Sequence, residues 1–131
     1  MSISLSTTTA NAALDQVGGQ FSSSGSLVLY TGTRPANPDT ALSGNTALVT
    51  FALPATPFTS ASAKTINIGA LPINATASAS GTAVWARAYN GSTAVFDADV
   101  STAGGGGDII VDNTSIASGV SVSLTAGQLG M

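Results

Sequence analysis

Aspartate is the one residue type in this chain whose chemistry and spacing define a candidate active site. Asp97 and Asp99 stand two residues apart, so on a β-strand their carboxylates would lie about 6.5–7 Å apart on one face. That separation overlaps the range between the acid and the base of a glycosidase. No neighbouring residue distinguishes an acid from a base, and only 5% of the residues are aromatic, which leaves little surface for stacking a sugar. We interpret both residues as solvated or interface aspartates.

The same aspartates begin a stretch that partly follows a calcium-binding loop. Asp97, Asp99 and Ser101 occupy ligand positions, and Asp108 occupies the twelfth place. Thr102 stands where the loop needs glycine, and the twelfth residue should be glutamate, because a bidentate carboxylate closes such a site. We therefore predict that the chain binds no metal ion.

The composition removes most of the side chains that enzymes use. The chain of 131 residues contains no His, Cys or Glu, and 7% of its residues are charged, so proton transfer and thiol chemistry lack their usual groups. The run Gly104–Gly107 lacks the Lys-Ser/Thr of a phosphate-binding loop, and we interpret it as a flexible loop. We expect a structural protein with no cofactor rather than an enzyme.

Charge and hydropathy also narrow the choice of partners. The cations Arg34, Lys64 and Arg87 are far apart in sequence, which argues against direct binding of nucleic acid. No apolar run is long enough to span a membrane, and residues 1–9 lack the pattern of a signal peptide, so we expect synthesis and use without secretion. A net charge of −3 with 44% hydrophobic residues indicates a subunit of an assembly, such as a homo-oligomer.

The hydrophobic pattern predicts a single domain over residues 1–131, with residues 1–8 as a possible N-terminal arm. Thr9 is the predicted N-cap of a short helix over residues 10–17, which ends at the following glycines. The expected buried stripe of this helix is Ala13, Leu14 and Val17.

The rest of the chain alternates short β-branched segments with turn residues, which is typical of an all-β fold. Strands are predicted near 26–31, 46–53, 64–69, 82–89, 94–100, 108–112 and 119–125. Residues 74–81 alternate like a strand but lack bulk, so an edge strand and an extended arm both remain open. The predicted fold class is an antiparallel β-sandwich, jelly-roll or immunoglobulin-like, with one short N-terminal helix.

The clearest local structure is a hairpin that turns at Asn90-Gly91, a dipeptide that suits a type I′ turn. The cross-strand parity of a regular hairpin puts these residues on one face, which we predict to be the core face: Ala83, Trp85, Phe96, Ala98 and Val100. The opposite face would carry Thr82, Val84, Ala86, Val95, Asp97 and Asp99, a small-residue surface suited to covering by a neighbouring subunit.

The predicted core residues are Trp85, Phe96, Leu29 and Val100, with Trp85 and Phe96 in contact across the hairpin. Arg87 falls on the Trp85 side, where we expect its guanidinium to lie over an aromatic ring while its head reaches water. We predict a structural role for Arg87, because no second cation or polar cluster accompanies it in the sequence.

Four sequence blocks occur in a recognisable order, Leu27–Ala36, Ala41–Val49, Gly81–Arg87 and Asp108–Ile116. This order resembles a family of small virion proteins of tailed bacteriophages and prophages. In that family the first block usually reads Tyr-Asp-Gly-Thr-Arg-Pro, whereas position 31 here is Thr. The helix before the blocks and the closing strand at 119–123 also correspond, so the resemblance covers nearly the whole chain.

The resemblance implies a capsid decoration or cement protein, made in the host cytoplasm and located on the capsid surface of the virion. Its partners would be the major capsid protein and copies of itself. A place in the tail stays open, as does a head-fibre adaptor or carbohydrate-binding module, which should display exposed aromatic rings.

A rigid domain laid across the junction of two shell subunits would strengthen the shell without chemistry, because the second contact becomes intramolecular. We expect the arm and the small-residue face to make these contacts. The predicted interface residues are Ile3, Leu5, Val84 and Val95. Whether the arm pairs within its own subunit or with another chain stays open.

Overall fold

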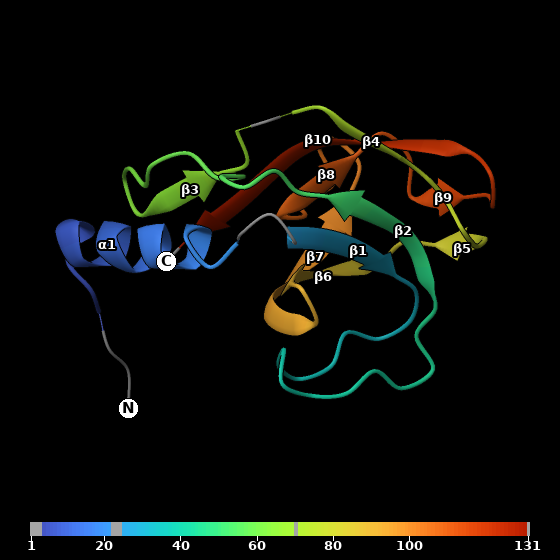
Figure 1. Cartoon of the computed structure of the whole chain (residues 1–131), viewed down its shortest axis with the longest axis horizontal. Coiled ribbons are helices and arrows are strands. Elements are labelled where there is room, and N and C mark those ends of the chain that lie inside the picture. Colours follow the sequence, from blue (N-terminus) through green and yellow to red (C-terminus); the bar gives the residue numbers. More distant parts are fainter. Residues whose placement is uncertain (1–3, 22–24, 70, 131) are drawn as a thin grey trace.

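The computed structural model describes residues 4–21, 25–69 and 71–130 of the chain. The fold is mostly β, with one short helix packed beside a curled sheet (Figure 1). The elements in chain order are α1 (Thr7–Gly18), β1 (Gly25–Tyr30), β2 (Ala47–Ala52), β3 (Thr65–Asn67), β4 (Ile73–Thr76), β5 (Gly81–Thr82), β6 (Trp85–Asn90), β7 (Thr93–Ser101), β8 (Ile109–Val111), β9 (Ser115–Ile116) and β10 (Ser121–Gly130). Within residues 4–21, 25–69 and 71–130, no helix is both long and apolar enough to cross a membrane.

Helix α1 begins earlier than the sequence predicts. Ser6, not Thr9, is the N-cap, and its Oγ accepts a hydrogen bond from Thr9 N at 3.2 Å. Ala10 and Leu14 lie one turn apart on the same face of the helix, and both are buried. Since α1 begins at Thr7, the last two residues of the predicted arm are helical.

Two side chains of α1 tie the helix to the segment before β3. Asn11 Oδ1 accepts a hydrogen bond from Lys64 N at 2.8 Å, and Asp15 Oδ1 accepts one from Ala61 N at 2.7 Å. These bonds satisfy backbone donors of an irregular segment, so they fix the helix and the β3 region as one lobe at the side of the sheet (Figure 1).

The main sheet has the strand order β2-β1-β6-β7-β8-β10-β3, and β4 also pairs with β10. It curls into a half-barrel, and β2 and β4 come together where Ser78 N donates to Leu48 O at 2.8 Å. The all-β prediction with one short helix is confirmed. The sheet is mixed, however, because β7 and β8 run parallel, with Val100 opposite Ile109.

The parallel pair follows from the glycine run between the two strands. Gly104 and Gly106 both adopt a φ of +85°, a conformation that other residues rarely reach. Gly107 N donates to Ser101 Oγ at 2.9 Å, and a Cβ at Gly107 would lie 2.8 Å from Ser101 N. These glycines allow a short loop to turn back and lay β8 alongside β7.

The inner face of the curled sheet holds the main hydrophobic core. Leu29 and Val100 are buried there, as predicted, and Phe96 is half-buried against the same core. Phe96 forms an edge-on cluster with Phe21 and Phe58 at centroid distances of 6.2 Å each. This cluster lies where α1 meets the sheet, so it joins the helix to the inner core.

The predicted register of the β6–β7 hairpin is wrong, because a β-bulge interrupts it. Ala88 pairs with Phe96 but Tyr89 pairs with Ala94, which leaves Val95 as the extra residue. The bulge reverses the parity of β7 relative to β6. Trp85 therefore shares its face with Asp97 and Asp99, and Phe96 lies on the opposite, inner face.

Two sequence predictions fail with that register. Trp85 is fully buried, with 0% exposure, but in a separate cluster on the outer face, so it does not contact Phe96 as predicted. The predicted small-residue face does not exist as one surface either. Ala86 lies in the inner core, whereas Asp97 lies on the outer face.

Candidate functional site

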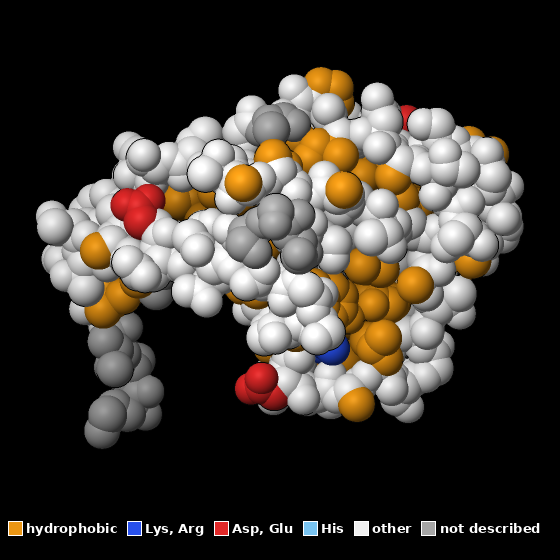
Figure 2. Space-filling model, viewed as in Figure 1, with side chains coloured by type: hydrophobic (Ala, Val, Ile, Leu, Met, Phe, Trp, Pro, Cys, Tyr) orange, Lys and Arg blue, Asp and Glu red, His pale blue; other side chains and the backbone are white. Residues whose placement is uncertain are grey.

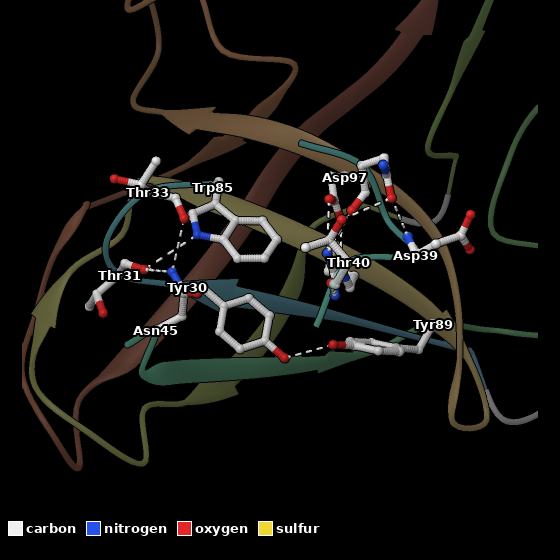
Figure 3. A network of polar contacts seen from close by, with 11 residues as sticks. Tyr30, Thr31, Thr33, Asp39, Thr40, Asn45, Trp85, Tyr89 and Asp97 are labelled. Atoms are coloured by element: carbon white, nitrogen blue, oxygen red, sulfur yellow. Dashed lines mark hydrogen bonds and ion pairs between the residues drawn. The ribbon is translucent and has the colours of Figure 1, made fainter. Parts of the chain in front are cut away.

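The long connection between β1 and β2, residues 31–46, covers the outer face of β1, β6 and β7. Under this 31–46 loop lie aromatic and charged side chains that Figure 3 shows together. They come from three neighbouring strands, because β6 pairs with β1 on one side and with β7 on the other. This loop and the side chains beneath it are the most elaborate polar arrangement in the described structure.

Aromatic rings form the first part of the arrangement. Tyr30 stacks on Trp85 with 4.8 Å between ring centroids and 22° between planes. Trp85 Nε1 donates to Thr31 O at 3.3 Å, and the hydroxyls of Tyr30 and Tyr89 are 2.8 Å apart. Burial raises the pKa of Tyr30 well above its usual value, and the hydrogen bond with Tyr89 is the second-largest cause of this rise. Tyr30 is therefore a neutral structural tyrosine.

A buried ion pair forms the second part. Arg87 Nε donates to Asp97 Oδ1 at 2.7 Å and Arg87 Nη2 to Asp97 Oδ2 at 3.1 Å, a bidentate geometry. Both side chains are only 5% exposed. The guanidinium carbon lies 5.2 Å from the Trp85 ring centroid, which confirms the predicted position over an aromatic ring. The prediction that the charged head reaches water is wrong, because the Arg87 side chain is buried. The hydrogen bond to Asp97 raises the pKa of Arg87 further.

The ion pair also holds the loop above it. Arg87 Nη1 donates to Thr40 O at 3.0 Å, and Arg87 Nη2 donates to Asn37 O at 3.3 Å. The Asn37 side chain accepts hydrogen bonds from Asp39 N and from Thr40 Oγ1, so this part of the loop is also closed on itself (Figure 3). Arg87 thus fixes the middle of the loop from below.

Both ends of the loop are fixed as well. Asn45 Nδ2 donates to Thr31 O at 2.7 Å and to Thr33 O at 3.1 Å, which ties the end of the loop to its start. Arg34 forms an exposed ion pair with Asp99 at 3.2 Å. Every buried side-chain nitrogen and oxygen of the described residues has a hydrogen-bond partner, which is typical of a network that sets the shape of a loop.

The three aspartates of the candidate sites each make a different contact. Asp97 pairs with Arg87 and Asp99 with Arg34, both on the outer face. Asp108 lies exposed after the glycine run, and its carbonyl accepts from Gln128 N at 2.9 Å. Among the residues that the structure describes, no three acidic side chains come together in a group that could hold a metal ion.

The structure does not bring the predicted interface residues into one patch. Ile3 lies outside the described residues, and Leu5 is half-buried just before α1. Val84 is 45% exposed just before β6, where its carbonyl accepts from Val100 N. Val95 lies toward the other end of the hairpin, half-buried at the bulge, so it is far along the strand from Val84.

Two grooves flank the end of α1. One of about 390 Å³ lies between the helix and β7 and is lined by Gln16, Val17, Gln20, Asn90, Thr93, Ala94 and Val95. The other, of about 270 Å³, lies on the side of Phe21 and Phe58. Val95 is therefore placed in a groove rather than on a flat face.

Comparisons with known proteins add no identification to this geometry. No protein-family model, curated protein or solved structure matches the chain.

Sequence reasoning missed the Arg87–Asp97 pair and the loop that it holds. The sequence does place the two residues in one predicted hairpin, with Arg87 in the first strand and Asp97 in the second. The regular register placed them on opposite faces, however, and only the bulge at Val95 brings them opposite each other.

Proposed function

We propose that this chain is a structural protein of a tailed-bacteriophage virion, a decoration or cement protein that binds the head shell and catalyses no reaction. Its proposed partners are the major capsid protein and further copies of itself. Its proposed place is the capsid surface, after synthesis in the host cytoplasm. The observation that carries the proposal is the order of the four sequence blocks that resemble phage virion proteins.

The positions of those blocks in the fold support the proposal. The first two blocks contribute β1, most of the 31–46 loop and part of β2, and the third contributes Trp85 and Arg87, which hold that loop. Because a loop that is already fixed loses little conformational freedom on binding, this arrangement suits a docking element. Leu42, one of the few large apolar side chains exposed in the described structure, lies on this loop.

The surface supports a role within an assembly. The chain has three basic and six acidic residues. Figure 2 shows a face where charged side chains are sparse and hydrophobic side chains gather over the middle of the sheet. A surface with so few charges suits covering by neighbouring subunits.

The proposal includes a finer description of the fold. We propose that the half-barrel is a variant of the β-sandwich, jelly-roll or immunoglobulin-like, with β2, β1, β6 and β7 as one flank and β8, β10, β3 and β4 as the other. The core that both flanks share, and the bond between Ser78 and Leu48 where they meet, support this description.

The alternative function, a tail or head-fibre adaptor or carbohydrate-binding module, has less support. A sugar-binding surface needs an exposed ring on which the sugar can stack. All seven aromatic side chains lie in the described residues, and each is buried or half-buried. The rings serve the inner core and the network under the 31–46 loop instead.

Particles of the encoding phage or prophage, produced with this gene deleted, provide the test. We expect purified protein to co-sediment with DNA-filled heads in a saturable manner and to raise the temperature at which the heads release DNA. Leu42→Asp on the 31–46 loop should weaken binding at least tenfold, while Val120→Asp, at an exposed apolar position elsewhere, should not. Absence of binding to heads contradicts the proposal, and binding to purified tails alone favours the alternative.

A further inference from the structure

The groove of about 390 Å³ beside α1 has the geometry of a site for an extended peptide. One wall is the last turn of α1 with Gln16 and Val17, and the other wall is the start of β7 with Thr93 and Val95. A groove between a helix and a strand lets a peptide pair with the strand through its backbone while its side chains pack on the helix.

The strand that forms this wall has a free edge. Residues 93–98 of β7, apart from Val95, pair with β6 on one side, and β8 reaches only Val100 and Ser101 on the other. Val100 N donates to the carbonyl of Val84, the residue just before β6, so the backbone groups of Val100 point toward β6. Backbone groups alternate in direction along a strand, so those of Asp97 point away from β6. At the bulge Val95 is the unpaired residue and lines the groove. No described strand pairs with this stretch, which leaves a template for strand addition.

The lining selects an uncharged occupant. The side chains around the groove are neutral, with amides, a hydroxyl and small apolar groups. Within this chain, residues 2–6 read Ser-Ile-Ser-Leu-Ser, which is uncharged and alternates with the period of a strand. On a strand Ile3 and Leu5 would share one face, and Val17 and Val95 offer the matching apolar contacts in the groove.

The segment cannot fill the groove of its own chain. It ends at Ser6, the N-cap of α1, whereas the groove lies at the C-terminal end of that helix. Gln16 is ten residues beyond Ser6, a rise of about 15 Å along the axis. Five residues span at most about 18 Å when extended, so the segment would only just reach the near end of the groove and could not lie along it.

We propose that the N-terminal segment of a second copy, residues 2–6, binds in this groove as an added strand on the free edge of β7. The partner's identity rests on the proposed assembly role, whereas the groove and the free edge are features of the fold itself. The segment contributes Ile3 and Leu5 to the contact, and the groove contributes Val17 and Val95. Residues from the arm and from the hairpin then form one interface, although they lie apart in the single chain.

The test uses purified protein without phage particles, so its failure is separate from failure to bind heads. A labelled peptide of residues 1–8 should bind to protein that lacks residues 1–5, as measured by fluorescence anisotropy. This deletion keeps Ser6, so the helix retains its cap. Light scattering of the full-length protein should show a concentration-dependent oligomer that the deletion converts to monomer.

Two variants make the test specific to the groove. Thr93→Arg puts a bulky side chain into the groove at an exposed position and should weaken peptide binding at least tenfold. Thr82→Arg, an exposed threonine of β5, is the matched control and should bind normally. A peptide with Ile3→Ser and Leu5→Ser should not bind.

Three results would overturn the proposal. The first is a peptide that does not bind, and the second is peptide binding that Thr93→Arg leaves unchanged. The third is an oligomer that survives deletion of residues 1–5, since the copies would then be joined through another surface. Circular dichroism of each variant shows whether a loss of binding comes from a loss of fold.

Discussion

Arg87 donates four hydrogen bonds, two to Asp97 and two to backbone carbonyls of the 31–46 loop. Its charge is buried, so Asp97 must neutralise it and the carbonyls must satisfy its remaining donors. A buried ion pair contributes little net stability compared with well-packed apolar residues, but the loss of one partner leaves an uncompensated charge. The function of this pair is therefore to fix a loop conformation.

Arg87→Ala should lower the free energy of unfolding by about 3–5 kcal/mol, because it leaves the Asp97 carboxylate buried without a partner. Urea unfolding measures this loss. Arg34→Ala, which breaks the exposed pair with Asp99, is the control and should cost less than about 1 kcal/mol. Equal effects of the two substitutions would contradict the structural role of the buried pair.

Tyr30 should make stability depend on alkaline pH. Its pKa is raised by burial and by Tyr89, while in the unfolded chain a tyrosine has a pKa of about 10. The unfolded state therefore loses this proton first, so the free energy of unfolding should fall as the pH rises above about 10. Tyr30→Phe should flatten that decline in urea titrations between pH 8 and pH 11.5. The same slope in both proteins would show that Tyr30 ionises freely in the fold.

At the scale of elements, strand positions were predictable and strand registers were not. The runs near 26–31, 46–53 and 94–100 were found because alternation and turn residues are local signals. The helix start was misplaced because Ser6, Thr7, Thr8 and Thr9 are all residue types that favour an N-cap. The structure places the start at Ser6, whose carbonyl accepts a hydrogen bond from Ala10 N at 2.8 Å, and residue type alone does not distinguish Ser6 from the three threonines.

The bulge at Val95 carries no signal in the sequence. An Asn-Gly dipeptide predicts a two-residue type I′ turn made of Asn90 and Gly91. This prediction is wrong by one residue, because Asn90 pairs with Thr93 and the turn is formed by Gly91 and Ser92, of which only Gly91 has a positive φ. The extra residue follows two positions after Thr93. It allows Phe96 to reach Phe21 and Phe58 on the inner face while Asp97 meets Arg87 on the outer face. Global packing, not local propensity, therefore sets the register.

Deletion of Val95 tests this register. Without the extra residue, either the hairpin turn must distort or Asp97 and Asp99 must turn toward the inner core, where charges are costly. We expect a loss of more than about 4 kcal/mol, seen as loss of the cooperative thermal transition in circular dichroism. Val95→Ala keeps the bulge and should cost about 1 kcal/mol. A stable deletion variant would mean that the hairpin is regular after all.

At the scale of the whole molecule, the curled sheet joins strands that are far apart in the chain. β10 pairs with β3, β4 and β8, and no local pattern specifies those partners. The sequence predicted an all-β domain with one helix because composition and spacing suffice for that level. The half-barrel depends on non-local contacts and was not predictable. The parallel β7–β8 pair was missed for a different reason, because the glycine run that allows it was interpreted only as a flexible loop.

At the same scale, we predict that the fold needs no metal ion. Asp97 and Asp99 already pair with Arg87 and Arg34, so a calcium ion would have to compete with two guanidinium groups. We expect thermal melting curves recorded in EDTA and in millimolar calcium to coincide. A clear rise of the melting temperature on calcium addition would instead identify the aspartates, with Asp108, as ligands.

We propose that the chain belongs to a phage particle, and its position there would distinguish the head from the tail. Cryo-electron microscopy of the intact virion of the encoding phage measures this position directly. We predict density for the half-barrel on the outer surface of the head, repeated with the symmetry of the shell and contacting it through the 31–46 loop. Density in the tail alone, or a purified virion that lacks the protein, would contradict the account.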